Sequence, residues 1–520
     1  MYSITLIVLS TFILVNAKNP CVHRDYGKGG TVCVCNATYC DTFDKIEKTS
    51  SGIITRFESN KNGLRFDKSL LKFKKQLNSF TQNNGKTIQI NRNKTLQEII
   101  GFGGAFTDAA AINIFSLKPQ LSQRIINDYY SSDGLSYTMG RIPIGGSDFS
   151  THKYTYDDLD KREDLELKKF NLTNEDLKYK IPLVKLALNV SSTIKLFGSP
   201  WSAPAWMKTN NDIAGKGSLK GDAGGPYYRS WAQYIVKFLN SYKSNGIEFW
   251  GLTVQNEPID GQIPGFPFNA MGYTAEQERD FIAKDLGPTL KAANYGINRL
   301  KLMIIDDNRS SVNKWANVIL NDSSSAQFVS GIAFHWYMNA ASPPTELDKT
   351  YQQFPNYFIL ATEACEGWSP FETVKVSLGD WGRAETYAYD IITDLQHYTS
   401  GWIDWNLALD TTGGPNWAKN FVDSPVIVNS TANEYYRQPM FYSLAHFTKF
   451  LEPLSRRIQT TDTGTDQLQT IAFVTPNQSV VVIVLNRLND TIPLTLVDPE
   501  LGSVETNVPP HSLQTYVWYK

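Results

Sequence analysis

Between residues 97 and 406, short apolar runs alternate with longer amphipathic stretches. In residues 228–242 the apolar positions recur every three to four residues, which is one face of a helix. Residues 274–293 and 383–398 have the same character. The apolar runs predict eight strands: Gln97–Gly103, Tyr137–Ile144, Thr193–Ser199, Glu248–Asn256, Leu300–Asp306, Gly331–Trp336, Tyr357–Thr362 and Gly401–Asn406. Eight such units over about 310 residues predict an α/β chain with a (β/α)8 TIM barrel, and a doubly wound open sheet is the alternative.

The flanking segments have no helical period. Four short, β-branched or alternating runs separated by turn residues predict strands at Gln469–Val474, Ser479–Asn486, Ile492–Val497 and Ser512–Trp518. The segment 53–90 is similarly rich in strand-forming residues. We expect a barrel from residues 97–406 plus 439–453 and a β-sandwich from 51–96 plus 454–520. The remaining residues, 18–50 plus 407–438, are expected to form a small antiparallel sheet.

Composition excludes several classes of protein. Of 520 residues, 42% are hydrophobic and 19% are charged, and the net charge is -1. A chain this apolar and this neutral is not disordered, and the lack of a basic excess argues against nucleic acid as a partner.

The amino terminus predicts entry into the secretory pathway. The apolar run Ile4–Val15 is too short to span a bilayer and ends in Val15-Asn16-Ala17, so we interpret residues 1–17 as a signal peptide. The rest of the sequence has no apolar stretch long enough for a transmembrane segment. Nine N-x-S/T sequons are glycosylation candidates: Asn36, Asn93, Asn171, Asn189, Asn308, Asn321, Asn429, Asn477 and Asn489.

The cysteines agree with an oxidising compartment. Cys21, Cys33, Cys35 and Cys40 form an even cluster just after the signal peptide, which predicts two disulfides. Their spacing allows three pairings and does not fit a zinc site. The remaining Cys365 is interpreted as a small buried hydrophobe. The six scattered histidines predict no metal cluster.

Two glutamates follow predicted barrel strands. Glu257 follows the fourth strand within Asn-Glu-Pro, and Glu363 follows the seventh. The active sites of TIM-barrel enzymes lie where the strands end, at the carboxyl face. Two carboxyl groups that face each other there are typical of glycoside hydrolases. One is a protonated acid and the other an ionised nucleophile.

Seven further runs carry a resemblance to a known family: Cys33–Cys40, Gly101–Asp108, Lys216–Gly221, Arg279–Pro288, Asp404–Leu409, Gly413–Trp417 and Phe421–Pro425. With these runs and the two glutamates, the chain resembles the glucosylceramidases of glycoside hydrolase family 30 over essentially its whole mature length. The resemblance implies a retaining β-glucosidase that needs no metal or cofactor and acts on glucosylceramide in the lysosome, with secretion as the alternative location. It further implies a glycosphingolipid substrate at a membrane surface, with a saposin-type activator and anionic lipid as partners.

The same resemblance assigns roles to individual residues. Glu257 corresponds to the acid/base and Glu363 to the nucleophile. Because the acid must start protonated, we expect burial and the charge of Glu363 to raise the pKa of Glu257, while Arg141 keeps that of Glu363 low. The further substrate-binding residues that it implies are Arg141, Asp148, Trp201, Asn256, Phe268, His335, Tyr337, Trp405 and Asn420. The implied disulfides are Cys21 with Cys33 and Cys35 with Cys40.

The sequence departs from the mammalian pattern in two loops. Phe266 stands where those enzymes have tyrosine, and the loop Cys365–Pro370 has an extra acid and a shifted aromatic residue. Both loops border the expected position of the lipid aglycone. Two other functions therefore stay open: a glycosidase of the same family acting on a β-linked xyloside or glucan, and a non-catalytic lipid or sugar receptor.

Overall fold

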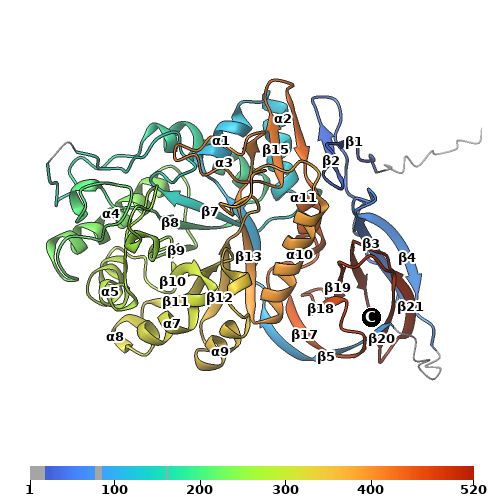
Figure 1. The fold of residues 1–520 in the computed structure, drawn as a ribbon. Coiled ribbons are helices and arrows are strands. Elements are labelled where there is room, and N and C mark those ends of the chain that lie inside the picture. Colours follow the sequence, from blue (N-terminus) through green and yellow to red (C-terminus); the bar gives the residue numbers. More distant parts are fainter. Residues whose placement is uncertain (1–17, 76–84, 160–161) are drawn as a thin grey trace, which may run out of the picture.

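The centre of the molecule is a closed barrel of eight parallel strands (Figure 1). The computed structural model describes residues 18–75, 85–159 and 162–520, and the predicted signal peptide lies outside them. Each predicted barrel strand is present, so the TIM barrel is confirmed and the open sheet is excluded. The strands are β6 (Gly101–Ala105), β7 (Met139–Ile144), β8 (Lys195–Pro200), β9 (Gly251–Thr253), β10 (Lys301–Asn308), β11 (Val329–His335), β12 (Phe358–Glu363) and β13 (Thr399–Asn406).

Helices surround the barrel. The predicted helix at 274–293 is divided: α5 passes through a single π-helical turn, Ile282–Leu286, into α6. Pro288 explains the change, since proline has no N–H to donate to the preceding turn and clashes with its carbonyl. The helices are α1 (Asp108–Phe115), α2 (Pro119–Tyr130), α3 (Ile181–Val190), α4 (Pro226–Ser244), α5 (Ala275–Phe281), α6 (Gly287–Ala292), α7 (Val312–Leu320), α8 (Ser323–Ala326), α9 (Thr345–Gln353), α10 (Trp381–Gln396) and α11 (Pro439–Thr448).

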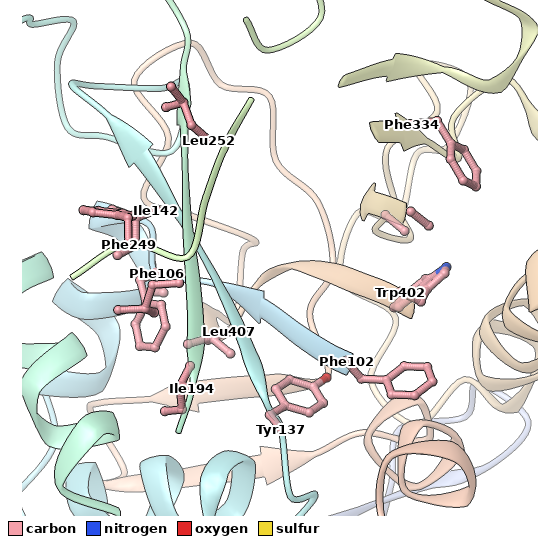
Figure 2. Packing of buried hydrophobic residues seen from close by; sticks show 14 of the residues in the cluster. Phe102, Phe106, Tyr137, Ile142, Ile194, Phe249, Leu252, Phe334, Trp402 and Leu407 are labelled. Carbon is pink, nitrogen blue, oxygen red and sulfur yellow. The ribbon is translucent and has the colours of Figure 1, made fainter. Parts of the chain in front are cut away.

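Alternation along the barrel strands separates two buried layers. Outward-facing side chains join the large core beneath the helices; Figure 2 shows Phe102, Ile142, Leu252, Phe334 and Trp402 among them. Inward-facing side chains form a separate cluster of Met139, Phe197, Met303, Ala333, Leu360 and Ile403. Side chains alternate along a strand. Every second residue beyond this cluster, toward the carboxyl end of a regular strand, therefore also points into the barrel.

Both ends of the chain build the β-sandwich. Its nine strands pair in the order β21-β20-β5-β17-β18-β19-β22-β3-β4. Side chains from both ends of this order share one apolar cluster, so the sheet folds onto itself. Residues 97–98, predicted as part of the first barrel strand, instead end β5, and β17 and β21 were not predicted. The strands are β3 (Ile53–Asn60), β4 (Asp67–Lys72), β5 (Lys86–Glu98), β17 (Arg456–Gly464), β18 (Gln469–Val474), β19 (Val480–Asn486), β20 (Ile492–Asp498), β21 (Gly502–Val508) and β22 (Ser512–Trp518).

A small sheet also joins distant parts of the chain. Its strands, in order, are β1 (His23–Asp25), β2 (Thr31–Cys35), β16 (Glu434–Arg437), β15 (Val426–Asn429) and β14 (Leu409–Asp410). The first four pair antiparallel, as predicted, whereas β14 pairs in parallel with β15. The disulfides Cys21–Cys33 and Cys35–Cys40 confirm the implied pairing. Cys365 is a buried free thiol.

Two surface properties bear on the sequence predictions. Within residues 18–75, 85–159 and 162–520, no helix is long and apolar enough to cross a bilayer. None of the asparagines of the nine sequons is buried. Asn36, Asn308 and Asn429 are half-buried, and Asn93, Asn171, Asn189, Asn321, Asn477 and Asn489 are exposed.

Candidate active site

A pocket lies at the carboxyl face of the barrel, with Glu257 and Glu363 in its wall. Glu363 is the last residue of β12, and Glu257 lies four residues after β9. A carboxylate oxygen of each glutamate and a ring nitrogen of His335 lie within 4.8 Å of one another. The structure therefore brings together the two carboxyl groups that the sequence pattern placed at the ends of separate strands.

Arg141 fixes Glu363 from inside the barrel. Its side chain is completely buried, and its Nη1 donates to Glu363 Oε2. The Tyr337 hydroxyl donates to the other oxygen, Oε1, at 2.7 Å. Arg141 also donates through Nη2 to Asn256 Oδ1 at 2.8 Å, so the arginine and the asparagine hold each other in place. Glu363 thus accepts two charge-assisted or short hydrogen bonds, an arrangement that favours its ionised form.

Asp306 connects Arg141 to His335. It accepts a hydrogen bond from Arg141 Nη2 at 2.7 Å, and its other oxygen lies 3.0 Å from His335 Nε2. The second ring nitrogen of His335, Nδ1, lies 3.0 Å from Glu257 Oε1. Burial raises the pKa of Asp306, but the charges of Arg141 and His335 outweigh burial and lower it. Burial lowers the pKa of His335, but the charges of Glu363 and Asp306 raise it to about 10, so the imidazole is a cation that donates on both sides.

Asp306 reaches this position because β10 is irregular. The register of β10 against β11 shifts between Ile305 and Asp307, and both Ile305 and Asp306 have positive φ angles, 77° and 55°. A positive φ is a true outlier for a β-branched residue. The Ile305 N–H, turned out of the ladder, donates to the buried Glu278 Oε1 at 3.0 Å. The bulge turns Asp306 into the barrel, and backbone strain of this kind persists where surrounding contacts impose it.

Aromatic rings and a carboxyl group line the deep part of the pocket. Trp201 and Trp405 stack with ring centroids 5.2 Å apart. Asp148 accepts hydrogen bonds from Asn416 Nδ2 at 3.1 Å and Asn420 Nδ2 at 3.0 Å. Burial raises the pKa of Asp148 to about 7, although the bond from Asn420 opposes this. Flat apolar faces beside a hydrogen-bonding carboxyl group suit a ring that carries hydroxyl groups.

The pocket entrance is aromatic as well. Phe266 and Phe268 lie edge to face with centroids 4.4 Å apart, and Trp368 lies 5.4 Å from Tyr337. All four rings line the pocket. The two loops that depart from the mammalian pattern therefore both contribute to its wall, Phe266 from one and Trp368 from the other. Cys365 also lines the pocket; burial raises the pKa of its thiol, as expected for an unreactive side chain.

Comparison with known proteins places the chain in a family. The glycosyl hydrolase family 30 TIM-barrel domain matches residues 99–451, and the beta sandwich domain of the same family matches residues 455–516. The chain belongs to glycosyl hydrolase family 30. It is 43% identical to the lysosomal acid glucosylceramidase of Mus musculus, over 96% of this chain and 95% of that protein.

A second relative and a solved structure agree with this placement. The chain is 43% identical to putative glucosylceramidase 4 of Caenorhabditis elegans over 99% of both proteins. The crystal structure of SrfJ from Salmonella typhimurium has a TM-score of 0.81 and 27% identity, covering 90% of this chain and 100% of that one. The family predicted from the sequence is therefore confirmed, and so is the class of enzyme, a glycoside hydrolase.

The pKa shifts in this family 30 site differ from the sequence-based expectation. Burial raises the pKa of Glu257, but the hydrogen bond and charge of His335 outweigh burial and lower it. For Glu363, burial and the charge of Glu257 outweigh the lowering by cations, so its pKa is raised. The charge of His335 lowers the pKa of both glutamates, but its Nδ1 is within hydrogen-bonding distance only of Glu257, at 3.0 Å against 3.9 Å for Glu363. The resemblance assigns this histidine to substrate binding.

Sequence reasoning missed three polar residues in or directly behind the family 30 pocket. Asp306 stands at the end of a predicted strand, the same signal that singled out the glutamates, but a second acid at 307 obscured which one faces inward. Asn416 holds Asp148 from a loop after the barrel. Asp260 lines the pocket three residues after Glu257. Every substrate-binding residue that was expected either lines this pocket or, for Arg141, Asn256 and His335, lies in the hydrogen-bonded network behind its carboxyl groups.

Proposed function

We propose that the protein is a retaining β-glucosidase that hydrolyses glucosylceramide to glucose and ceramide. The observation that carries the proposal is the approach of oxygens from Glu257 and Glu363 to within 4.8 Å of each other. Retaining glycosidases have carboxyl groups about 5–5.5 Å apart, whereas inverting enzymes separate them by about 6.5–9.5 Å to admit a water molecule. The short separation supports direct attack by one carboxylate on the sugar.

In the first step, Glu363 attacks the anomeric carbon of glucose. Glu257 gives its proton to the glycosidic oxygen, the bond from that oxygen to the anomeric carbon breaks, and ceramide leaves. Arg141 and Tyr337 keep Glu363 oriented, because each donates to one of its oxygens. The product of this step is a glucosyl ester on Glu363.

In the second step, Glu257 removes a proton from water and the hydroxide attacks the anomeric carbon. The bond to Glu363 breaks, its electrons return to the carboxylate, and glucose leaves with the β configuration. The ester carries no charge on Glu363, which makes Glu257 easier to ionise than in the free enzyme. One residue therefore serves as acid and then as base.

The deep pocket supports glucose as the sugar. Asp148, held by Asn416 and Asn420, offers a carboxyl group to sugar hydroxyls, and Trp405 offers an aromatic face. Asn256 is fixed by Arg141 beside both glutamates and is placed for the 2-hydroxyl, whose hydrogen bonds strengthen in the transition state.

The lipid half of the substrate is supported by the relatives and by the surface near the pocket. Two relatives over almost the full chain are glucosylceramidases by name. Phe371, three residues beyond the pocket residue Trp368, is 92% exposed. An exposed aromatic residue beside the entrance suits a lipid surface. We include in the proposal action at a membrane, a saposin-type activator, anionic lipid, and a lysosomal location reached through the secretory pathway, with N-glycans on exposed sequons.

The test is hydrolysis of glucosylceramide in vesicles with and without anionic lipid, measured beside aryl β-glucoside and aryl β-xyloside. We expect ceramide release that increases with anionic lipid, and a clear preference for glucoside over xyloside. Proton NMR during hydrolysis should show β-glucose before mutarotation. Initial release of α-glucose would exclude the retaining mechanism, and faster cleavage of the xyloside would exclude the proposed substrate.

A further inference from the structure

A third carboxyl group lies beside Glu257 in the pocket wall. Asp260 begins the short helical turn Asp260–Gln262, and its N–H donates to the Glu257 carbonyl oxygen at 3.0 Å. The turn directs the Asp260 side chain into the same pocket as Glu257 and Glu363. The carboxyl groups of Asp260 and Glu257 lie within reach of each other. Two carboxyl groups this close can hydrogen-bond only when one of them carries a proton.

The charges around this pair differ on its two sides. Glu257 faces the His335 cation from β11, with Arg141 of β7 farther off, and both favour its ionised form. Asp260 faces acids: burial and the charges of Glu257, Asp307 of β10 and Glu363 of β12 all raise its pKa. Burial raises the pKa of Asp307 to about 6, with the charge of Glu257 adding to the effect. The pair as a whole therefore holds one proton across the acidic and neutral range.

We propose that Asp260 is a positioning residue that shares one proton with Glu257 and so keeps the acid/base loaded against the opposing charge of His335. This inference rests on the proposed function and deepens it. The proton passes from the pair through Glu257 to the glycosidic oxygen, which leaves two adjacent carboxylates. Their mutual repulsion makes Glu257 a stronger base, which takes the proton from water in the second step. The pair then holds one proton again.

Replacing the carboxyl group should move the pH dependence. In Asp260→Asn the neutral amide donates to the Glu257 carboxylate and removes the repulsion, so Glu257 ionises at lower pH. We expect the basic limb of kcat/KM for a substrate with a poor leaving group to move down by about one unit or more. A dinitrophenyl β-glucoside, whose leaving group needs little protonation, should lose several-fold less activity. Asp260→Glu, which keeps a carboxyl group, should restore much of the basic limb.

The matched control is Asp212→Asn on the neighbouring loop. Asp212 pairs with Lys153 at 2.6 Å at the surface and does not line the pocket, so the same change of charge should leave the profile unmoved. Asp260→Ala provides a second variant should the asparagine variant unfold, and circular dichroism checks both. A folded, active Asp260→Asn or Asp260→Ala enzyme with an unchanged basic limb overturns the role of Asp260 and leaves the proposed function standing. A wild-type enzyme without β-glucosidase activity overturns both.

Discussion

Arg141 and His335 are buried cations set among carboxyl groups. Asp306 lies between them and contacts both, at 2.7 Å and 3.0 Å. Removing one partner from a buried ion pair leaves the other charge uncompensated, which costs about 3–5 kcal/mol. The carboxyl groups on the pocket side are therefore held by a network whose members depend on one another, and substitutions within it are expected to be non-additive.

Glu363→Gly tests the nucleophile directly. The variant should retain less than about 1% of wild-type activity, because the covalent step is lost. Azide should enter the space left by the side chain and restore turnover of an activated aryl glucoside. Since azide attacks from the nucleophile's side, the product should be the α-glucosyl azide, which NMR identifies.

The control is Glu366→Gln, in the loop that follows Glu363. Burial raises the pKa of Glu366 to about 7, so the side chain is neutral at pH 5 and glutamine imitates it. This variant should keep most of its activity at that pH. A β-glucosyl azide from Glu363→Gly would instead assign the nucleophile to a residue on the opposite face of the sugar.

At the residue scale, the sequence predicted those site residues whose position depends only on where a barrel strand ends. Glu257 and Glu363 follow strands, and strand ends meet at one face of a barrel. Asp306 was not predicted, because its side chain points into the barrel only through the bulge in β10, and the apolar pattern of that strand does not predict a bulge. The order of the two pKa values was not predictable, because it depends on which glutamate is hydrogen-bonded to His335.

Among the helices, α11 connects the barrel to the sandwich through a buried polar side chain. His446 lies 2.9 Å from Ser59 Oγ of β3 through Nε2, and 2.9 Å from Thr515 Oγ1 of β22 through Nδ1. Burial lowers the pKa of His446 to about 3, so the ring stays neutral where an unfolded histidine would bind a proton. The unfolded state therefore binds more protons between about pH 6.5 and pH 3, and stability falls as pH decreases through that window.

His446→Gln should reduce this acid destabilisation. At pH 5 the buried neutral histidine costs about 2 kcal/mol relative to neutral pH. Glutamine does not titrate, so the variant should lose less of its melting temperature between pH 7.5 and pH 5, whatever its stability at pH 7.5. The same substitution at the exposed His152 is the control. An unchanged pH dependence in His446→Gln would contradict the assignment of a neutral ring.

Periodicity predicted the elements well where one physical rule governed them. All eight barrel strands and α4 lie where their apolar patterns predicted them, although β9 is only three residues long and β6 begins four residues later than predicted. The division of the helix at 274–293 depends on Pro288, and the missed strand β17 has mainly exposed side chains, so it has no apolar alternation to detect. Where β5 ends and β6 begins was not predictable either, because only Ile99 and Ile100 separate the two strands and neither is a turn residue.

For the whole molecule, the sandwich depends on strands from both ends of the chain. β5 pairs with β17 from Lys86 to Glu98, and β3 pairs with β22 along most of its length. A chain shortened to residues 18–454 keeps β3, β4 and β5 but loses every antiparallel partner that β5 has in the described sheet, as well as the shared core. The exposed edges and apolar faces favour aggregation.

We therefore expect the 18–454 chain to be insoluble on expression, even though its barrel is intact. Sedimentation and β-glucosidase assays of the soluble fraction measure this. Co-expression of residues 455–520 as a separate chain is the control and should recover part of the soluble activity. A soluble and active 18–454 chain would show that the sandwich is dispensable for folding.

Because β3 pairs with β22, its pairing cannot be completed until the end of the chain has been synthesised. Ile54 lies opposite Trp518, and Thr55 opposite Val517. A ribosome adds about 5–20 residues per second, so β3 emerges roughly half a minute or more before its partner exists. During that interval the strand has one free edge and an uncovered apolar face. We therefore expect the nascent chain to be prone to aggregation through β3 until β22 has emerged, and slower translation near the 3′ end of the message should lengthen that interval.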